Sequence, residues 1–167
     1  IDLICLFDES RYPGEEQEAR ASFIKVTRRM TAILSDATDG YVFRSDLRLR
    51  PDASVTPVCL SMAAAEAYYE AEGRTWERAA YIKARPVAGD LKAAERLIKS
   101  LEPFVYRRYL DYNAVDSLRE MKALIAHEVE RKGMERNIKL GPGGIREIEF
   151  IAQMFQLIYG GRRPALR

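Results

Sequence analysis

The first residues that suggest chemistry in this sequence lie in one charged stretch, residues 41–50. Read as a β-strand, its alternation puts Arg44, Asp46, Arg48 and Arg50 on one face and mostly apolar side chains on the other. Guanidinium groups present planar forks of donors that match phosphate oxygens. Asp46 among them is well placed to hold a cation beside that anion. The alternative is a solvated face with a simple Arg–Asp pair.

A second carboxylate, Asp2, stands at the head of an apolar segment, residues 1–8, that predicts a strand buried on at least one face. Paired carboxylates on neighbouring strands are what a divalent-cation site for phosphoryl or nucleotidyl transfer requires. Mg²⁺ and Mn²⁺ prefer such oxygen ligands. In these sites two ions lie about 3.5–4 Å apart and hold the attacking and leaving oxygens of an in-line displacement. Asp2 and Asp46 are therefore candidate metal ligands.

The composition narrows the function classes. The chain has 167 residues, 47% hydrophobic and 31% charged, with a net charge of +2, which argues against a nucleic-acid binder. A single histidine, His127, argues against a histidine-based zinc site or a serine-type triad. Cys5 and Cys59 lie in apolar stretches and predict buried free thiols. No apolar run reaches the roughly 20 residues of a membrane helix, and the start lacks the basic flank of a signal peptide, so a cytoplasmic setting is expected.

The spacing of apolar residues predicts a strand–helix–strand–strand opening followed by helices, which is an α+β arrangement. The expected elements after the first strand are a helix at 15–34, strands at 41–50 and 57–60, and helices at 62–72, 75–84, 91–101, 116–132 and 145–159. Ser61, Asp90 and Asp116 are the expected N-caps. The apolar stripe expected on the first helix consists of Ala19, Phe23, Val26, Met30 and Ile33, and that of the helix at 116–132 of Leu118, Met121, Ile125 and Val129.

A glycine-rich turn, residues 141–144, leads directly into the last predicted helix. Free backbone N–H groups at such a turn can bind an anion, although a tight helix entry is the simpler interpretation. The expected core face of this helix consists of Ile145, Ile148, Ile151, Phe155 and Ile158. A separate polar stripe consists of Arg146, Glu149, Gln153 and Gln156.

Four segments together resemble the glutamine synthetase adenylyltransferase/adenylyl-removing family: Ile-Asp-Leu-Ile at 1–4, Arg-Ser-Asp-Leu-Arg-Leu-Arg-Pro at 44–51, Lys-Ala-Arg at 83–85 and Gly-Gly-Ile-Arg-Glu-Ile-Glu-Phe at 143–150. The resemblance covers essentially the whole chain. It implies a partial DNA polymerase β-like nucleotidyltransferase domain at residues 1–103, followed by the start of a helical bundle at 104–167. Phe-Val-Tyr-Arg-Arg-Tyr-Leu-Asp at 104–111 and Asn-Ile-Lys-Leu-Gly at 137–141 are more similar to the N-terminal half of such enzymes.

By this resemblance, the expected activity is removal of AMP from a tyrosine of glutamine synthetase by phosphorolysis, with inorganic phosphate as the attacking group and ADP as product. The implied cofactor is Mg²⁺ or Mn²⁺. The implied partners are adenylylated glutamine synthetase and a nitrogen-regulatory signalling protein, with no nucleic acid and no membrane. Three alternatives stay open: the half that attaches AMP from ATP, another protein nucleotidyltransferase such as the uridylyltransferase of the nitrogen-signalling protein, and a non-catalytic helical module that binds a partner.

The resemblance also implies residue roles. Asp2 would be the second aspartate of the family's first metal motif, and Asp46 the third carboxylate. The first aspartate and a preceding Gly-Ser element are absent from this sequence, so metal affinity is expected to fall and the fragment alone to be inactive. Arg48 and Arg50 are expected to contact phosphate. The remaining candidates are Lys83 and Arg85 for the cleft, and Arg146, Glu147 and Glu149 as supporting contacts behind the glycine turn.

Overall fold

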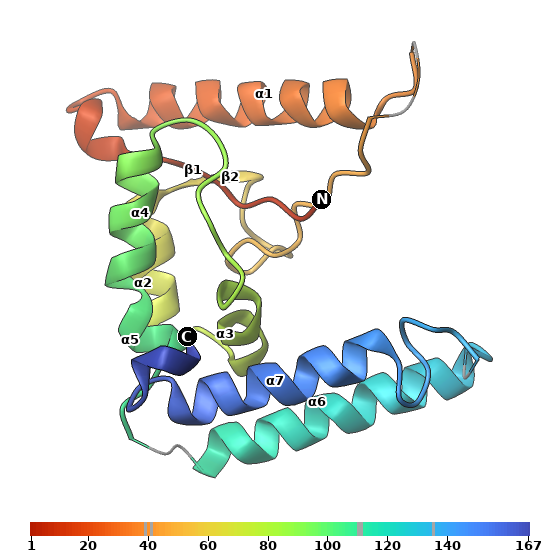
Figure 1. The fold of residues 1–167 in the computed structure, drawn as a ribbon. Helices are drawn as coiled ribbons and strands as arrows, with labels where there is room; N and C mark the ends of the chain where they lie inside the picture. The colour runs from red at the N-terminus through yellow and green to blue at the C-terminus, as the bar shows by residue number, and fades with distance from the viewer. Residues whose placement is uncertain (39, 41, 110–111, 135) are drawn as a thin grey trace. The chain divides into compact units, whose positions relative to one another are not determined.

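The computed structural model describes residues 1–38, 40, 42–109, 112–134 and 136–167 (Figure 1). The chain divides into two compact units, Ile1–Gly73 with Ala88–Leu97, and Arg74–Val87 with Ile98–Arg167. Residues 74–87 thus belong to the second unit. The domain boundary predicted after residue 103 refers to the end of a nucleotidyltransferase domain, and it stays a prediction. Tyr41, Leu110 and Asp111, which the sequence analysis used, lie outside the described residues.

A two-stranded parallel sheet lies at the centre of the first unit. β1 (Cys5–Phe7) pairs with β2 (Cys59–Ser61), with Cys5 opposite Cys59. Parallel strands need a long crossover, and here the connection includes α1 (Glu16–Ser35), which contacts both strands (Figure 1). A 3₁₀ turn, η1 (Glu9–Arg11), precedes α1, and α2 (Met62–Ala71) follows β2 directly. The predicted first strand, first helix and last strand of this unit are confirmed in that order, with β2 in place of the strand at 57–60.

The core of this unit forms between β1, β2 and the first half of α1. Phe7, Ala19 and Cys59 are buried, and Phe7 stacks on Phe23 with ring centroids 5.2 Å apart. Cys5 and Cys59 are free thiols, as predicted, and burial raises the pKa of both. These thiols therefore behave as small core residues.

The predicted apolar stripe of α1 is correct only in its first half. Ala19 is buried and Phe23 packs in the core, but Val26 and Ile33 are each 61% exposed. Thr27, four residues after Phe23, is buried instead, and its hydroxyl partly offsets the rise in the pKa of both thiols. The buried face of α1 therefore continues by one helical turn from Phe23 to Thr27, and Val26 lies outside it.

The predicted strand at 41–50 is wrong for most of its length. Among its described residues only Asp46 forms a strand bridge, and turns follow from residue 48. Side-chain bonds to the backbone replace a strand ladder here: the Asp46 carboxylate accepts from the Arg48 backbone N–H, and the Arg50 guanidinium binds carbonyl oxygens of the loop. Strand alternation therefore does not place Arg48 and Arg50 on the face of Asp46.

The second unit is helical. Its elements are α3 (Thr75–Tyr81), α5 (Glu102–Val105), α6 (Tyr112–Arg131), α7 (Ile145–Tyr159) and the 3₁₀ turn η2 (Pro164–Leu166), and α4 (Leu91–Ser100) contributes its last three residues. Short α3 contacts α5, α6 and α7 and is thus the centre of the unit. The Tyr81 and Phe104 rings meet edge-on at 6.5 Å. Across the described ranges, no helix has both the length and the apolarity that a membrane crossing requires.

Two of the three predicted helix caps are confirmed. The Ser61 hydroxyl accepts from the Ala64 N–H and begins α2, and the Asp90 carboxylate accepts from the Ala93 N–H at the start of α4. Asp116 lies inside α6, which begins earlier than predicted. Helix α3 ends at Tyr81, three residues sooner than expected, so Lys83 lies beyond it.

The predicted core face of α7 is also wrong. Ile145, Ile148, Ile151 and Phe155 are between 44% and 64% exposed, while Leu157 is buried. Among the described residues α3 and η2 contact this helix and Lys122 of α6 reaches its first turn, but the isoleucine row is not the buried side. On α6, Val129 is buried as predicted, whereas the side chains of Leu118 and Met121 lie outside the described residues.

Candidate functional site

The two predicted metal ligands are direct neighbours across strands. Asp2 and Asp46 form an isolated parallel bridge in which the Asp46 N–H donates to the Ile1 carbonyl and the Leu3 N–H donates to the Asp46 carbonyl, each at 2.8 Å. Residues paired in this way project their side chains to the same face. The structure therefore brings these two carboxylates, 44 positions apart in the chain, to one side of one pair of strands.

Arg48 holds the Asp46 carboxylate in its ionised form. Its Nε lies 2.9 Å from both carboxylate oxygens, and its Nη2 forms an ion pair with Oδ2. These bonds, with the Arg48 backbone N–H, lower the pKa of Asp46 to about 2. The pKa of Arg48 is raised, mainly by Asp46 and to a smaller extent by the charge of Asp2. One exposed guanidinium thus lies in the field of both candidate ligands.

Arg50 is committed to the loop rather than to the site. Its Nη1 donates to the Leu47 carbonyl at 2.8 Å, and its Nη2 donates to the Ala53 and Thr56 carbonyls at 2.8 and 3.0 Å. A guanidinium with three carbonyl partners fixes the turn that follows Asp46. The phosphate contact expected of Arg50 stays a prediction. In the structure, the Arg50 side chain orders this loop.

The remaining candidates belong to the second unit. Lys83 Nζ forms an ion pair with Glu149 Oε1 at 2.6 Å, which lowers the pKa of Glu149. Lys122 on α6 pairs with Glu147 at 2.9 Å, and Glu147 also accepts from the Gly143 N–H at 2.7 Å; both contacts lower its pKa. Arg85, beyond α3, and Arg146, in the first turn of α7, are exposed. The glutamates behind the glycine turn therefore connect α7 to its neighbours.

The donor set at Asp2 and Asp46 fits a hard divalent cation in chemistry, since both groups offer carboxylate oxygens and Asp46 is ionised well below neutral pH. Within the described ranges, no three or more histidine, cysteine, aspartate or glutamate side chains are placed to hold a metal ion together. A cation here would need further ligands from water, substrate or other protein groups, and it would compete with Arg48 for Asp46.

Two buried charges on α3 were missed by the sequence analysis. Glu77 and Arg78 are 1% and 2% exposed, and Arg78 donates to the Val105 carbonyl through Nε at 3.2 Å and Nη2 at 3.1 Å. Glu77 accepts from the Arg74 N–H at 2.8 Å. The sequence signal for their burial is an adjacent glutamate and arginine between Trp76 and two alanines, in a helix too short to expose one whole face to solvent.

The Asp46–Arg48 pair gives a prediction about pH. In Arg48→Ala the pKa of Asp46 should rise from about 2 toward its ordinary 3.8, which a carboxyl NMR titration would measure. Because the folded-state pKa is depressed, the pair stabilises the fold above about pH 4 and loses its effect as pH falls toward 2. Arg48 is 77% exposed, so solvent screens the pair and its contribution to stability should be small. An unchanged Asp46 titration in Arg48→Ala would contradict the pairing.

The sequence matches known protein families. Residues 1–100 match the family glutamate-ammonia ligase adenylyltransferase, and residues 119–166 match the family PII-uridylyltransferase. The full chain is 53% identical to a bifunctional glutamine synthetase adenylyltransferase/adenylyl-removing enzyme of Nitrosococcus oceani and 58% identical to one of Pseudomonas syringae pv. tomato. An enzyme of the same name from Rhizobium meliloti is 53% identical.

The chain spans only 17–18% of the length of these relatives, although all of it is matched. The first family covers more than half of the chain and includes both Asp2 and Asp46. The identity extends through both units. On this evidence the chain belongs to the glutamate-ammonia ligase adenylyltransferase family.

Proposed function

We propose that this chain supplies two carboxylates and a phosphate-binding arginine to a nucleotidyltransferase centre of the DNA polymerase β type, which removes AMP from adenylylated glutamine synthetase. The observation that carries the proposal is the pairing of Asp2 with Asp46 on one face, beside Arg48. A bound Mg²⁺ or Mn²⁺ would neutralise charge on the adenylyl phosphate and on the attacking oxygen. Asp2 and Asp46 would hold such an ion.

The reaction balances as a phosphorolysis. An oxygen of inorganic phosphate bonds to the adenylyl phosphorus, the bond from that phosphorus to the tyrosine oxygen breaks, and the tyrosine oxygen takes up a proton as ADP is released. Arg48 is suited to receive phosphate because its side chain is 77% exposed and it binds the Asp46 carboxylate, which the cation would also engage. Asp46 stays ionised throughout the neutral range because its pKa is about 2.

The adenylyl-removing half is favoured over the adenylyl-attaching half by the residues at 104–109 and 137–141, which are more similar to the former. Adenylylated glutamine synthetase and a nitrogen-regulatory signalling protein are the proposed macromolecular partners, and the proposed location is the cytoplasm. Lys83, Arg85, Arg146, Glu147 and Glu149 are proposed as supporting residues. The two ion pairs Lys83–Glu149 and Lys122–Glu147 support that part of the proposal, since they order the start of α7.

The test uses a full-length family enzyme that carries this sequence. Adenylylated glutamine synthetase with inorganic phosphate and Mg²⁺ or Mn²⁺ should yield ADP in proportion to the tyrosine released, and omission of phosphate should abolish the product. AMP transfer from ATP to unmodified glutamine synthetase, without phosphate-dependent ADP release from the modified enzyme, would assign this chain to the attaching half instead.

A second candidate is uridylyl transfer to the nitrogen-signalling protein, which the match of residues 119–166 to PII-uridylyltransferase favours. Offering UTP and the signalling protein to the same full-length enzyme separates the two candidates, because an adenylyl-removing enzyme should leave both unchanged. The 53–58% identity over the whole chain to bifunctional adenylyltransferase/adenylyl-removing enzymes supports an enzyme of that kind more strongly than the match to part of the second unit supports a uridylyltransferase.

A further inference from the structure

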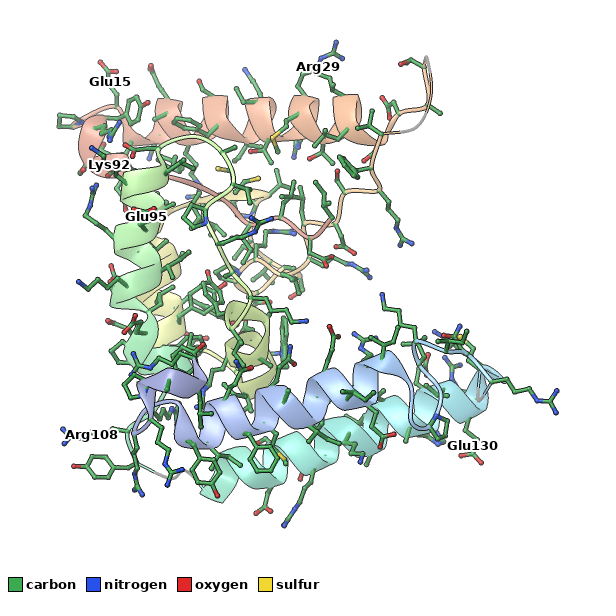
Figure 2. The ribbon with its side chains drawn as sticks, in the orientation of Figure 1. Glu15, Arg29, Lys92, Glu95, Arg108 and Glu130 are labelled. Atoms are coloured by element: carbon green, nitrogen blue, oxygen red, sulfur yellow. The ribbon has the colours of Figure 1, made fainter. Side chains whose placement is uncertain are left out.

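Two segments of the second unit, far apart in sequence, bring arginines together. Arg107 and Arg108 follow α5, while Arg162 and Arg163 follow α7. The two segments are joined directly, because Arg162 Nε donates to the Arg108 carbonyl at 2.9 Å. Figure 2 shows Arg108 on the outer side of the chain after α5. These four residues are called the arginine cluster below.

The backbone beneath the arginine cluster is closely packed. A Cβ added at Gly160 would lie 2.7 Å from Tyr106 Cδ1, and one added at Gly161 would lie 2.9 Å from the Arg108 nitrogen and closer still to the Arg107 carbonyl oxygen. Only glycine permits this approach. The Arg167 guanidinium lies 5.2 Å from the centre of the Tyr106 ring, a cation–π contact that stabilises the same region. The cluster is therefore held on a fixed backbone.

Three members of the arginine cluster, Arg108, Arg162 and Arg163, carry positive charge that no acid among the described residues offsets. Among the described residues, no carboxylate lies within ion-pair distance of Arg108, Arg162 or Arg163, whereas Arg167 is paired with Glu102 at 2.9 Å. All three side chains are exposed, and neighbouring Tyr109 is 76% exposed. Arginine with an exposed tyrosine is the composition that protein interfaces favour.

We propose that the arginine cluster is a docking surface for an acidic segment of a protein partner. A single small anion would gain little on such an exposed surface, because water and salt screen each guanidinium. A protein segment offers several carboxylates at once and excludes water as it covers Tyr109. Nucleic acid fits less well, since the whole chain has a net charge of only +2. This surface is additional to the proposed nucleotidyltransferase site and does not depend on it.

The test measures binding of a fluorescein-labelled oligo-glutamate peptide to the 167-residue chain by anisotropy at low salt. In Arg108→Glu/Arg163→Glu the affinity should fall by about tenfold. The matched control, Arg28→Glu/Arg29→Glu on the exposed side of α1, changes the net charge by the same amount and should lower the affinity by less than about twofold. An oligo-glutamine peptide should not bind.

Four results would overturn the inference. Equal losses in the variant and the control would mean that net charge alone attracts the peptide. Absence of binding, or equal binding of oligo-glutamine, would show that the arginine cluster is not a docking surface for acidic segments. Tighter binding of a single-stranded DNA of similar length would assign the cluster to nucleic acid. If Arg108→Glu/Arg163→Glu lowers the thermal midpoint, Arg108→Gln/Arg163→Gln should still weaken peptide binding in the same direction.

Discussion

Asp46→Asn should abolish AMP removal by a full-length family enzyme that carries this sequence, with a loss of rate on the order of 1,000-fold or more. The substitution keeps the shape of the side chain but removes the charge that a divalent cation requires. It also weakens the contact with Arg48, whose bonds now hold the pKa of Asp46 at about 2. The measurement is phosphate-dependent ADP release from adenylylated glutamine synthetase at saturating Mg²⁺ or Mn²⁺.

Asp36→Asn is the matched control for this prediction. Asp36 is exposed at the end of α1, and removal of its charge should leave the rate within about twofold of the unsubstituted enzyme. Circular dichroism should show the same helical content in both variants, because Asp46 bridges Asp2 through backbone atoms that the substitution retains. A normal phosphorolysis rate in Asp46→Asn would remove Asp46 from the metal site and would leave the proposed function on family membership alone.

Arg78→Met should lower the free energy of unfolding by about 3 kcal/mol, the largest effect on stability that we expect from a single change in the second unit. Arg78 is 2% exposed and binds the Val105 carbonyl with two nitrogens. Methionine fills part of the volume but leaves this buried carbonyl without the donor. Urea denaturation followed by circular dichroism gives the difference.

Arg119→Met provides the comparison, because Arg119 is 77% exposed on α6 and its ion pair with Asp116 is largely solvated. Its free energy of unfolding should change by less than about 0.5 kcal/mol. If the two methionine variants unfolded at the same urea concentration, Arg78 would not be the anchor between α3 and α5.

The sequence predicted the long helices well because their apolar spacing and caps act locally. The α1 bounds differ from the predicted ones by one residue at each end, the α7 bounds coincide with them, and Ser61 and Asp90 cap the helices they were expected to cap. The two candidate metal ligands could be predicted from the sequence for a similar reason, since Asp2 and Asp46 each lie in a short segment that resembles the family.

Other features depended on contacts that no local pattern contains. The chain turns after the bridge residue Asp46, and the Arg50 guanidinium holds that turn by binding three carbonyls, a contact that strand alternation cannot reveal. Arg78 is buried because the Val105 carbonyl, 27 positions later, needs a donor. The isoleucine row of α7 is exposed because burial depends on which neighbour is present and not on periodicity alone. In each case a tertiary contact, and not the local sequence pattern, determines the structure.

The single bridge between Asp2 and Asp46 has a consequence for the kinetics of exchange with solvent. Among the described residues these segments are joined by backbone hydrogen bonds from the Leu3 and Asp46 amides and by one from the Ile1 amino group to the Arg44 carbonyl, and the regular ladder begins farther on, at Cys5. A ladder end of this kind opens far more often than the sheet interior, so these two amides should exchange with deuterium early. An ion that ties both carboxylates would slow that exchange, which makes deuterium uptake at Leu3 and Asp46 a direct reporter of cation occupancy.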